Sequence, residues 1–236
     1  MEDALNRAAG VERVVGPPYY TFPGNAFVSG RRNTNWADVV AVARSDLSGQ
    51  GSCGVSFVNR VVTSNDYPTE PGAGFEKFAY LVYDPACNAD RLNLAHELGH
   101  QLGMEHDPTN FEGWWVPGFT TSCPWSFGHK RNTGDAQYRF RTVMAYWENA
   151  YGGPGGPQSC GSSGACPQID AFSTPLLEWA NGLYPFGTVT GASQIGVPVH
   201  SPTQYRANNA DTAQRIAPIV QDYRARPDII FGNGFQ

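Results

Sequence analysis

Three histidines and one glutamate stand at a spacing that could bind and use a metal ion. The stretch from His96 to Asp107 reads HELGHQLGMEHD and fits the pattern H-E-x-x-H-x-x-G-x-x-H. Residues four apart on a helix lie on one face, with Cβ atoms about 5–6 Å apart. His96 and His100 can therefore direct both imidazoles at one tetrahedral ion, and this pattern is typical of zinc.

The residues beside and beyond this pair supply the rest of such a site. Glu97 lies next to His96, and a carboxylate within reach of a water on zinc can accept its proton. Gly103 can enter left-handed backbone space without a Cβ penalty, so we expect it to end the helix and return the chain. His106 then becomes the third ligand. In the alternative, the histidines only pack or face solvent, which leaves their spacing without a reason.

Several segments before the motif predict the strands and the helix that position it. Ala37–Ala43 is apolar almost throughout, as a central strand covered on both faces would be. Gly54–Val58 alternates, which indicates a half-exposed or edge strand. Phe78–Tyr83 predicts a further buried strand. The catalytic helix should then begin after Asn88 or Asp90, either of which is a good N-cap.

The predicted helix carries a broad apolar surface, which favours burial in an enzyme core: Leu92, Leu94, Ala95, Leu98 and Leu102. Beyond His106 the chain becomes irregular and rich in aromatic residues. A final helix should start at Asn209 or Asp211 and run towards Tyr223, with Pro218 causing a kink if it lies inside. These elements predict an α+β fold.

Composition limits the class of protein. The chain has 236 residues, enough for one domain with two lobes. Charged residues are 16% and the net charge is −5, with no basic cluster of the kind that nucleic acid requires. No stretch approaches the ~20 apolar residues that span a bilayer. We expect a soluble, monomeric protein without nucleic-acid or membrane partners.

The five cysteines lack the paired C-x-x-C spacing of a structural zinc site. Disulfides are the better interpretation for a protein of secreted type. We favour a bridge between Cys53 and Cys87 and a second among Cys123, Cys160 and Cys166, although spacing alone does not fix the pairing. The odd count leaves at least one cysteine outside a bridge.

We expect one catalytic domain over residues 1–236, with an upper lobe to about residue 103, a lower lobe over 104–228 and a tail over 229–236. The sequence shows no signal peptide, so we expect the signal and a propeptide to lie outside this chain. We see no strand before the helical stretch Ala4–Ala9. The first strand of the sheet is therefore expected to be missing.

The extended motif resembles the metzincin clan of zinc metallopeptidases, whose second signature is a methionine-containing turn beneath the metal. Arg141–Tyr146 resembles that turn and contains Met144. Asp107 after the third histidine is similar to the reprolysin group. The segments Phe140–Tyr146, Phe172–Pro175 and Asn208–Thr212 look most like the bacterial peptidyl-Asp metallopeptidases, and the resemblance runs from about Trp36 to Arg224.

This resemblance implies a twisted mixed sheet and catalytic helix in the upper lobe, an irregular, partly helical lower lobe, and a secreted bacterial endopeptidase that uses Zn²⁺. It implies an oxyanion donor in Tyr146, although a packed ring is the alternative, and supporting roles for Gly103, Asp107 and Met144. It also implies cleavage before acidic residues of a peptide or protein substrate. Arg141 is then the first candidate for the substrate cation, with Lys130, Arg131 and Arg139 as alternatives.

Two other functions are compatible with the motif. One is a zinc-binding adhesion or interaction module on the same scaffold, which the presence of Glu97 disfavours because a binding protein needs no base. The other is hydrolysis of a non-protein amide. The sequence is also compatible with bound Ca²⁺ beside the zinc.

Overall fold

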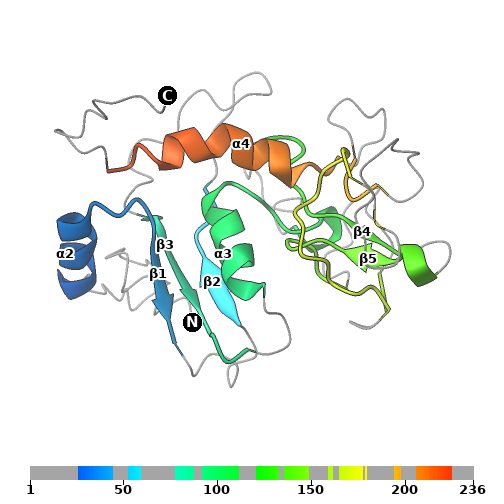
Figure 1. Ribbon diagram of the computed structural model, residues 1–236, viewed down its shortest axis with the longest axis horizontal. Helices are drawn as coiled ribbons and strands as arrows, with labels where there is room; N and C mark the ends of the chain where they lie inside the picture. The colour runs from blue at the N-terminus through cyan, green and yellow to red at the C-terminus, as the bar shows by residue number, and fades with distance from the viewer. Residues whose placement is uncertain are drawn as a thin grey trace, which may run out of the picture.

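The computed structural model describes residues 26–44, 53–59, 78–87, 92–111, 121–132, 136–148, 159–161, 165–177, 179, 194–197 and 206–224. The fold is α+β and metzincin-like, as the sequence predicts. In Figure 1 a three-stranded sheet lies on one side of the molecule and a two-stranded sheet on the other, with the motif helix α3 (Asn93–Gln101) between them. The last helix, α4 (Asn209–Val220), runs across the top of both parts.

The larger sheet has the order β1–β3–β2. β1 (Val40–Ala43) pairs in parallel with β3 (Tyr80–Tyr83), in the register Val40 to Tyr80. β2 (Gly54–Ser56) pairs with β3 in antiparallel fashion, in the register Val55 to Val82. Within the described strands β2 is an edge strand, which confirms the interpretation of its alternating sequence. α2 (Ala26–Asn35) lies beside β1.

The prediction that Ala37–Ala43 forms the central strand is wrong. Along β1 the residues alternate between half-buried and exposed, whereas Tyr80–Val82 of β3 are buried. Val40 and Val42 pack against the Tyr80 and Val82 cluster. The other face of β1 carries alanines, which count as apolar in a sequence pattern even where they are exposed. An apolar run of this kind therefore looks the same as a strand that is covered on both faces.

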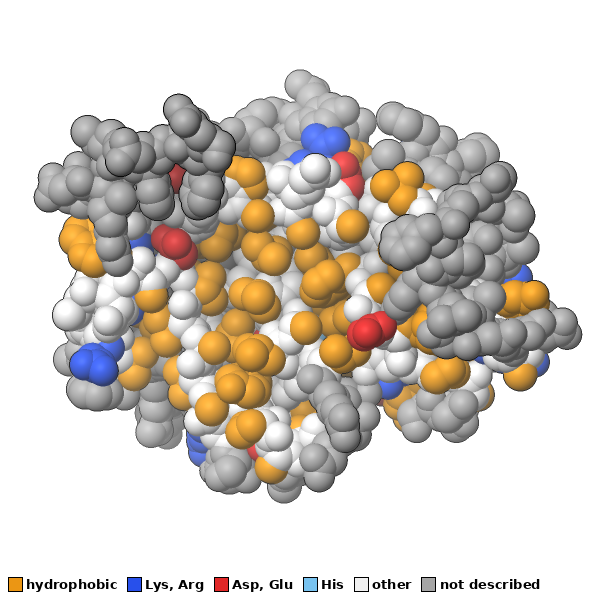
Figure 2. Space-filling model, in the orientation of Figure 1, with side chains coloured by type: hydrophobic (Ala, Val, Ile, Leu, Met, Phe, Trp, Pro, Cys, Tyr) orange, Lys and Arg blue, Asp and Glu red, His pale blue; other side chains and the backbone are white. Residues whose placement is uncertain are grey.

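α3 begins at Asn93, and Leu92 at its N-cap provides no side-chain cap. The predicted caps Asn88 and Asp90 lie outside the described residues. The helix is less buried than predicted, because Leu94 and Leu98 are exposed. Figure 2 shows apolar side chains gathered over the middle of this face of the molecule, where Figure 1 places α3.

Gln101 at the end of α3 ties the helix to the sheet. It is fully buried, and its Nε2 donates to Ser56 Oγ at 2.8 Å and to the carbonyls of Phe57 and Tyr80, each at 3.0 Å. One amide thus bridges β2, β3 and the helix that carries His96 and His100. This bond pattern fixes the helix against the sheet edge.

The lower lobe is built from short elements: η3 (Pro108–Asn110), β4 (Lys130–Arg131), η5 (Ala136–Tyr138) and β5 (Phe140–Arg141). Its core includes the cluster of Phe140, Ile169 and Ile195. Trp125 is buried there, and Trp114 and Trp115 lie outside the described residues.

α4 carries Pro218 inside it. Its cap differs from both candidates, because the Asn208 side chain accepts the N–H of Asp211 at 3.2 Å. Asn208, Asn209 and Asp211 are all good capping types, so composition could not choose among them.

Two disulfides are present among the described residues. Cys53 at the start of β2 bonds Cys87 after β3, and Cys160 bonds Cys166. Both agree with the expected pairing, and Cys123 is a free, buried thiol. No helix in the described part of the chain is long and apolar enough to cross a membrane.

Candidate metal centre

The three motif histidines converge on one point. The Nε2 atoms of His96 and His106 are 3.1 Å apart, and those of His100 and His106 are also 3.1 Å apart. His96 and His100 are buried and His106 is half-buried. Zn–N bonds of about 2.0–2.1 Å in a tetrahedron place such nitrogens about 3.4 Å apart. The spacing therefore fits one zinc ion.

Backbone carbonyls orient two of these rings. His96 Nδ1 lies 2.9 Å from the carbonyl oxygen of Val143, and His100 Nδ1 lies 2.8 Å from that of Met104. A carbonyl only accepts, so each Nδ1 carries the proton and each Nε2 presents a lone pair towards the other histidines. Lone pairs that face one another are unfavourable unless a cation lies between them. The donor set and its orientation thus suit a divalent metal.

Gly103 brings the third histidine back to the helix. Its φ is +77°, in the left-handed region that glycine enters at low cost. A Cβ at this position would also lie 2.7 Å from Ser122 Oγ and 3.1 Å from the Asn59 carbonyl. Both the backbone angle and the crowding therefore require glycine where the chain turns towards His106.

Glu97 lies beside the histidines and is 5% exposed. Burial raises the pKa of Glu97 to about 8. Gly54 of β2 makes the room, because a Cβ there would lie 2.7 Å from Glu97 Cγ and 2.8 Å from Asn93 Oδ1. Asn93 in turn donates to the carbonyl of Cys53, so the start of β2 is tied to the helix that carries Glu97.

Met144 packs directly against the motif helix. It is fully buried in a cluster with Met104 and Val143. A Cβ added to Gly99, between Glu97 and His100 in sequence, would lie only 2.5 Å from Met144 Sδ. The thioether therefore occupies the space that a side chain at Gly99 would fill.

Tyr146 follows Met144 and stays on the surface of the site, 39% exposed. Its ring centroid lies 4.4 Å from that of His106 and 5.6 Å from that of His96. The ring thus lies beside the rings of His106 and His96.

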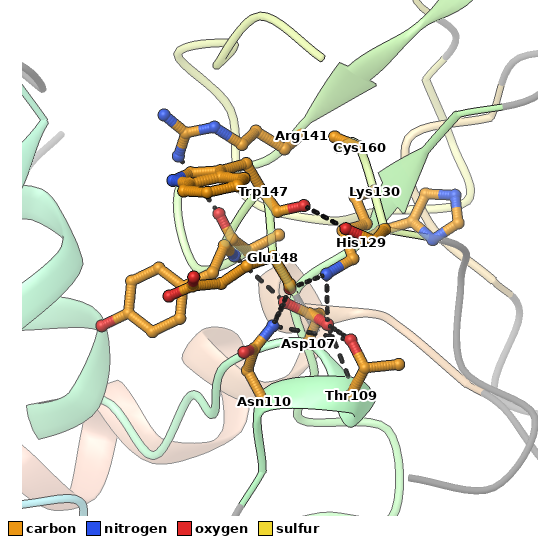
Figure 3. A network of polar contacts seen from close by, with 12 residues as sticks. Asp107, Thr109, Asn110, His129, Lys130, Arg141, Trp147, Glu148 and Cys160 are labelled. Atoms are coloured by element: carbon orange, nitrogen blue, oxygen red, sulfur yellow. Dashed lines mark hydrogen bonds and ion pairs between the residues drawn. The ribbon is translucent and has the colours of Figure 1, made fainter. Parts of the chain in front are cut away.

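Asp107 is a buried carboxylate that joins three segments of the lower lobe (Figure 3). Oδ1 accepts from Thr109 and lies 3.1 Å from Lys130 Nζ of β4. Oδ2 accepts from Asn110 Nδ2 at 2.8 Å and from the N–H of Tyr146 at 3.0 Å. The residue after the third histidine thereby holds the segment that carries Tyr146.

The sequence matches the profile of metallopeptidase family M12B, reprolysin-like, over residues 22–163. The chain belongs to this family. The family is one of metallopeptidases. Comparison with curated proteins gave no match. A solved structure described as a chaperone–substrate complex is 16% identical with a TM-score of 0.46, covering 86% of this chain and 26% of that chain. Family membership rests on the sequence match alone.

Two cavities open on the candidate metal centre of this family member. The larger, about 400 Å³, is bordered by the following residues among others: Gly54, Asn93, Arg141, Tyr146, Trp147 and Glu148. The smaller, about 260 Å³, is bordered by Val55, Val58, Glu105, His106, Asn110 and Phe111 among others. Gly54, His96, Glu97 and Tyr146 border both. The metal centre thus lies between two spaces along the edge of β2.

Of the four cations considered for substrate binding, Arg141 borders the larger cavity. It is buried, and its Nη1 donates to the Ala145 carbonyl at 3.2 Å. Lys130 instead lies inside the protein against Asp107, which removes it as a candidate. Arg131 and Arg139 border neither cavity.

Sequence reasoning missed Gly54 and Asn110, and it considered Lys130 only as a substrate-binding cation. Gly54 makes room for Glu97, and Asn110 and Lys130 surround Asp107. Lys130 is far from Asp107 in sequence, and a lysine in a polar stretch looks like surface charge. Asn110, three residues after Asp107, had the better signal, because such spacing suits a local capping bond.

Proposed function

We propose that this metallopeptidase is a secreted, metzincin-type endopeptidase that hydrolyses internal peptide bonds. The observation that carries the proposal is the set of three inward-facing imidazoles with a buried glutamate beside them, between two cavities. The two disulfides agree with an extracellular location. We further infer a single catalytic domain, with upper and lower lobes that divide near Gly103.

Zinc held by His96, His100 and His106 would, when bound, acidify a coordinated water and polarise the substrate carbonyl. Glu97 accepts the proton of the attacking water on its carboxylate and passes it to the leaving amine. Its burial beside the histidines and its position on both cavities support this role. Met144 supports the histidines from below, as the methionine of a Met-turn.

Tyr146 is the second catalytic residue in this proposal. Its hydroxyl donates a hydrogen bond to the oxyanion that develops as water adds to the peptide carbonyl. The support is its place beside His96 and His106 and its position on both cavities.

The substrate backbone adds as a strand along the outer edge of β2. Gly54 borders both cavities, and Val55 and Ser56 border the smaller one, so an extended peptide paired there would cross the metal centre. Substrate side chains on the two sides of the cut would then enter different cavities.

We assign the larger cavity to the residue after the cut and propose that Arg141 favours an acidic side chain there. This would place the enzyme with the peptidyl-Asp metallopeptidases. Glu148 borders the same cavity, and its negative charge opposes that preference. The preference for acidic residues therefore requires that the substrate side chain contact Arg141 and not Glu148.

Digestion of denatured proteins by the purified enzyme, with the cut ends mapped by mass spectrometry, tests the proposal. We expect internal cuts enriched before Asp, abolished by a chelator and restored by zinc. Cuts without an acidic preference would remove the role of Arg141 only. Metal binding without any peptide cleavage would overturn the endopeptidase assignment.

A further inference from the structure

The larger cavity has a wall made by Tyr146–Glu148, and these three residues all border it. Polar partners hold this wall at several backbone groups. The Tyr146 N–H donates to Asp107 Oδ2 at 3.0 Å, and the Trp147 carbonyl accepts the N–H of Cys160 at 2.8 Å. The Glu148 carbonyl accepts from Asn110 Nδ2 at 2.6 Å and from Lys130 Nζ at 2.5 Å.

Lys130 is the unusual member of this set. Its side chain is fully buried in an ion pair with Asp107, whose side chain is also fully buried. A buried lysine loses the free energy of hydration of its ammonium group, and contacts with its partners must compensate for that loss. It contacts one carboxylate and one carbonyl, and they belong to two different segments: the loop after His106 and the cavity wall (Figure 3).

We propose that Lys130 is a positioning residue that sets the cavity wall relative to the metal centre, and so governs how the enzyme binds substrate residues after the cut. This rests on the proposed endopeptidase function. The ammonium joins the wall to Asp107, and Asp107 follows the metal-binding His106 directly. Loss of Lys130 leaves the Glu148 carbonyl its bond from Asn110 and so loosens this end of the wall. Tyr146 stays beside the histidines, because Asp107 separately holds its N–H.

Lys130→Met tests this, because it keeps the length of the apolar stem and removes the charge. The substrates are peptides with the same residues before the cut, shortened stepwise after it. We expect zinc content and zinc affinity to stay at the wild-type level. The kcat/KM for the longest peptide should fall on the order of tenfold to a hundredfold, since small displacements at a site have effects of that size. The loss should shrink as the peptide is shortened.

Arg131→Met, the neighbouring position in β4, is the matched control and should behave like the wild type. An equal loss for every peptide length would mean that Lys130 only stabilises the fold, and no loss would also overturn the proposal. If Lys130→Met fails to fold, Asn110→Ala removes the other donor to the Glu148 carbonyl, together with one donor to Asp107 Oδ2, and leaves the ion pair between Lys130 and Asp107 in place. The same dependence on peptide length is then required. Wild-type enzyme that cleaves none of the peptides would instead contradict the endopeptidase function.

Discussion

Glu97 is the residue on which hydrolysis depends most directly in the proposed mechanism. Glu97→Gln keeps the shape of the side chain but cannot accept the proton, so kcat should fall at least about a hundredfold. Zinc content should stay the same, because the histidines bind the metal. Steady-state kinetics with metal analysis of the same sample measures both. Asp222→Asn, an exposed position after α4, controls for loss of one carboxylate. Full activity in Glu97→Gln would exclude it as the base.

Tyr146 offers a second test at this scale. Tyr146→Phe keeps the ring that packs near His106 and His96 and removes only the hydroxyl. If the hydroxyl stabilises the oxyanion, kcat should fall about a hundredfold while KM and bound zinc change little. Unchanged kcat would leave Tyr146 as a packing residue at the rim of the cavity.

At the scale of elements, Gly99 shows how closely α3 and the Met144 turn are packed. Alanine is the better helix former by about 1 kcal/mol, so propensity alone predicts that Gly99→Ala stabilises the protein. The added Cβ would lie 2.5 Å from Met144 Sδ and 3.3 Å from Met104 Sδ. We expect packing to win and the variant to be less stable by about 1–3 kcal/mol, measured by urea unfolding.

Gly30→Ala is the matched control for this packing argument. Gly30 also lies inside a helix, α2, but a Cβ there meets nothing within 4 Å. The substitution should therefore stabilise by about 0.5–1 kcal/mol through propensity. Stabilisation of both variants would mean that Met144 moves aside without cost and does not fix the helix.

The sequence predicted the parts of the site that depend on short-range geometry. Helical spacing aligned His96 with His100, and Gly103 had to turn the chain for His106. Contacts between distant segments could not be predicted in this way, because no spacing rule connects Lys130 to Asp107. The strand that is buried on both faces was misassigned for a related reason, since burial is a property of neighbouring strands as much as of the strand's own residues.

At the scale of the whole molecule, the lower lobe should make stability depend on pH through His129. His129 precedes β4, and its backbone binds Thr142, which follows β5. The His129 N–H donates to Thr142 Oγ1 at 2.9 Å, and the His129 carbonyl accepts the Thr142 N–H at 2.9 Å. The ring lies 5.7 Å from that of Phe140. Burial, with a smaller effect from Arg131, lowers the pKa of His129 to about 3.

The sign of the effect follows from where each state binds the proton. In the unfolded chain His129 titrates near pH 6.5, well above its value in the folded protein. The unfolded state therefore takes up the proton first as the pH falls. The stability that depends on neutral His129 is fully present above about pH 6.5 and is lost progressively as the pH falls towards 3. The loss is at most about 2 kcal/mol at pH 5.

Urea unfolding of the wild type and of His129→Gln at about pH 7.5 and pH 5 isolates this contribution, because glutamine does not titrate. Both proteins lose zinc and protonate the other histidines over the same range, so those changes cancel when the two pH dependences are subtracted. The free energy of unfolding should fall more steeply with acid in the wild type. Parallel pH dependences would show that the ring of His129 is hydrated in the folded protein. The packing around β4 and β5 would then be looser than the hydrogen bonds between His129 and Thr142 indicate.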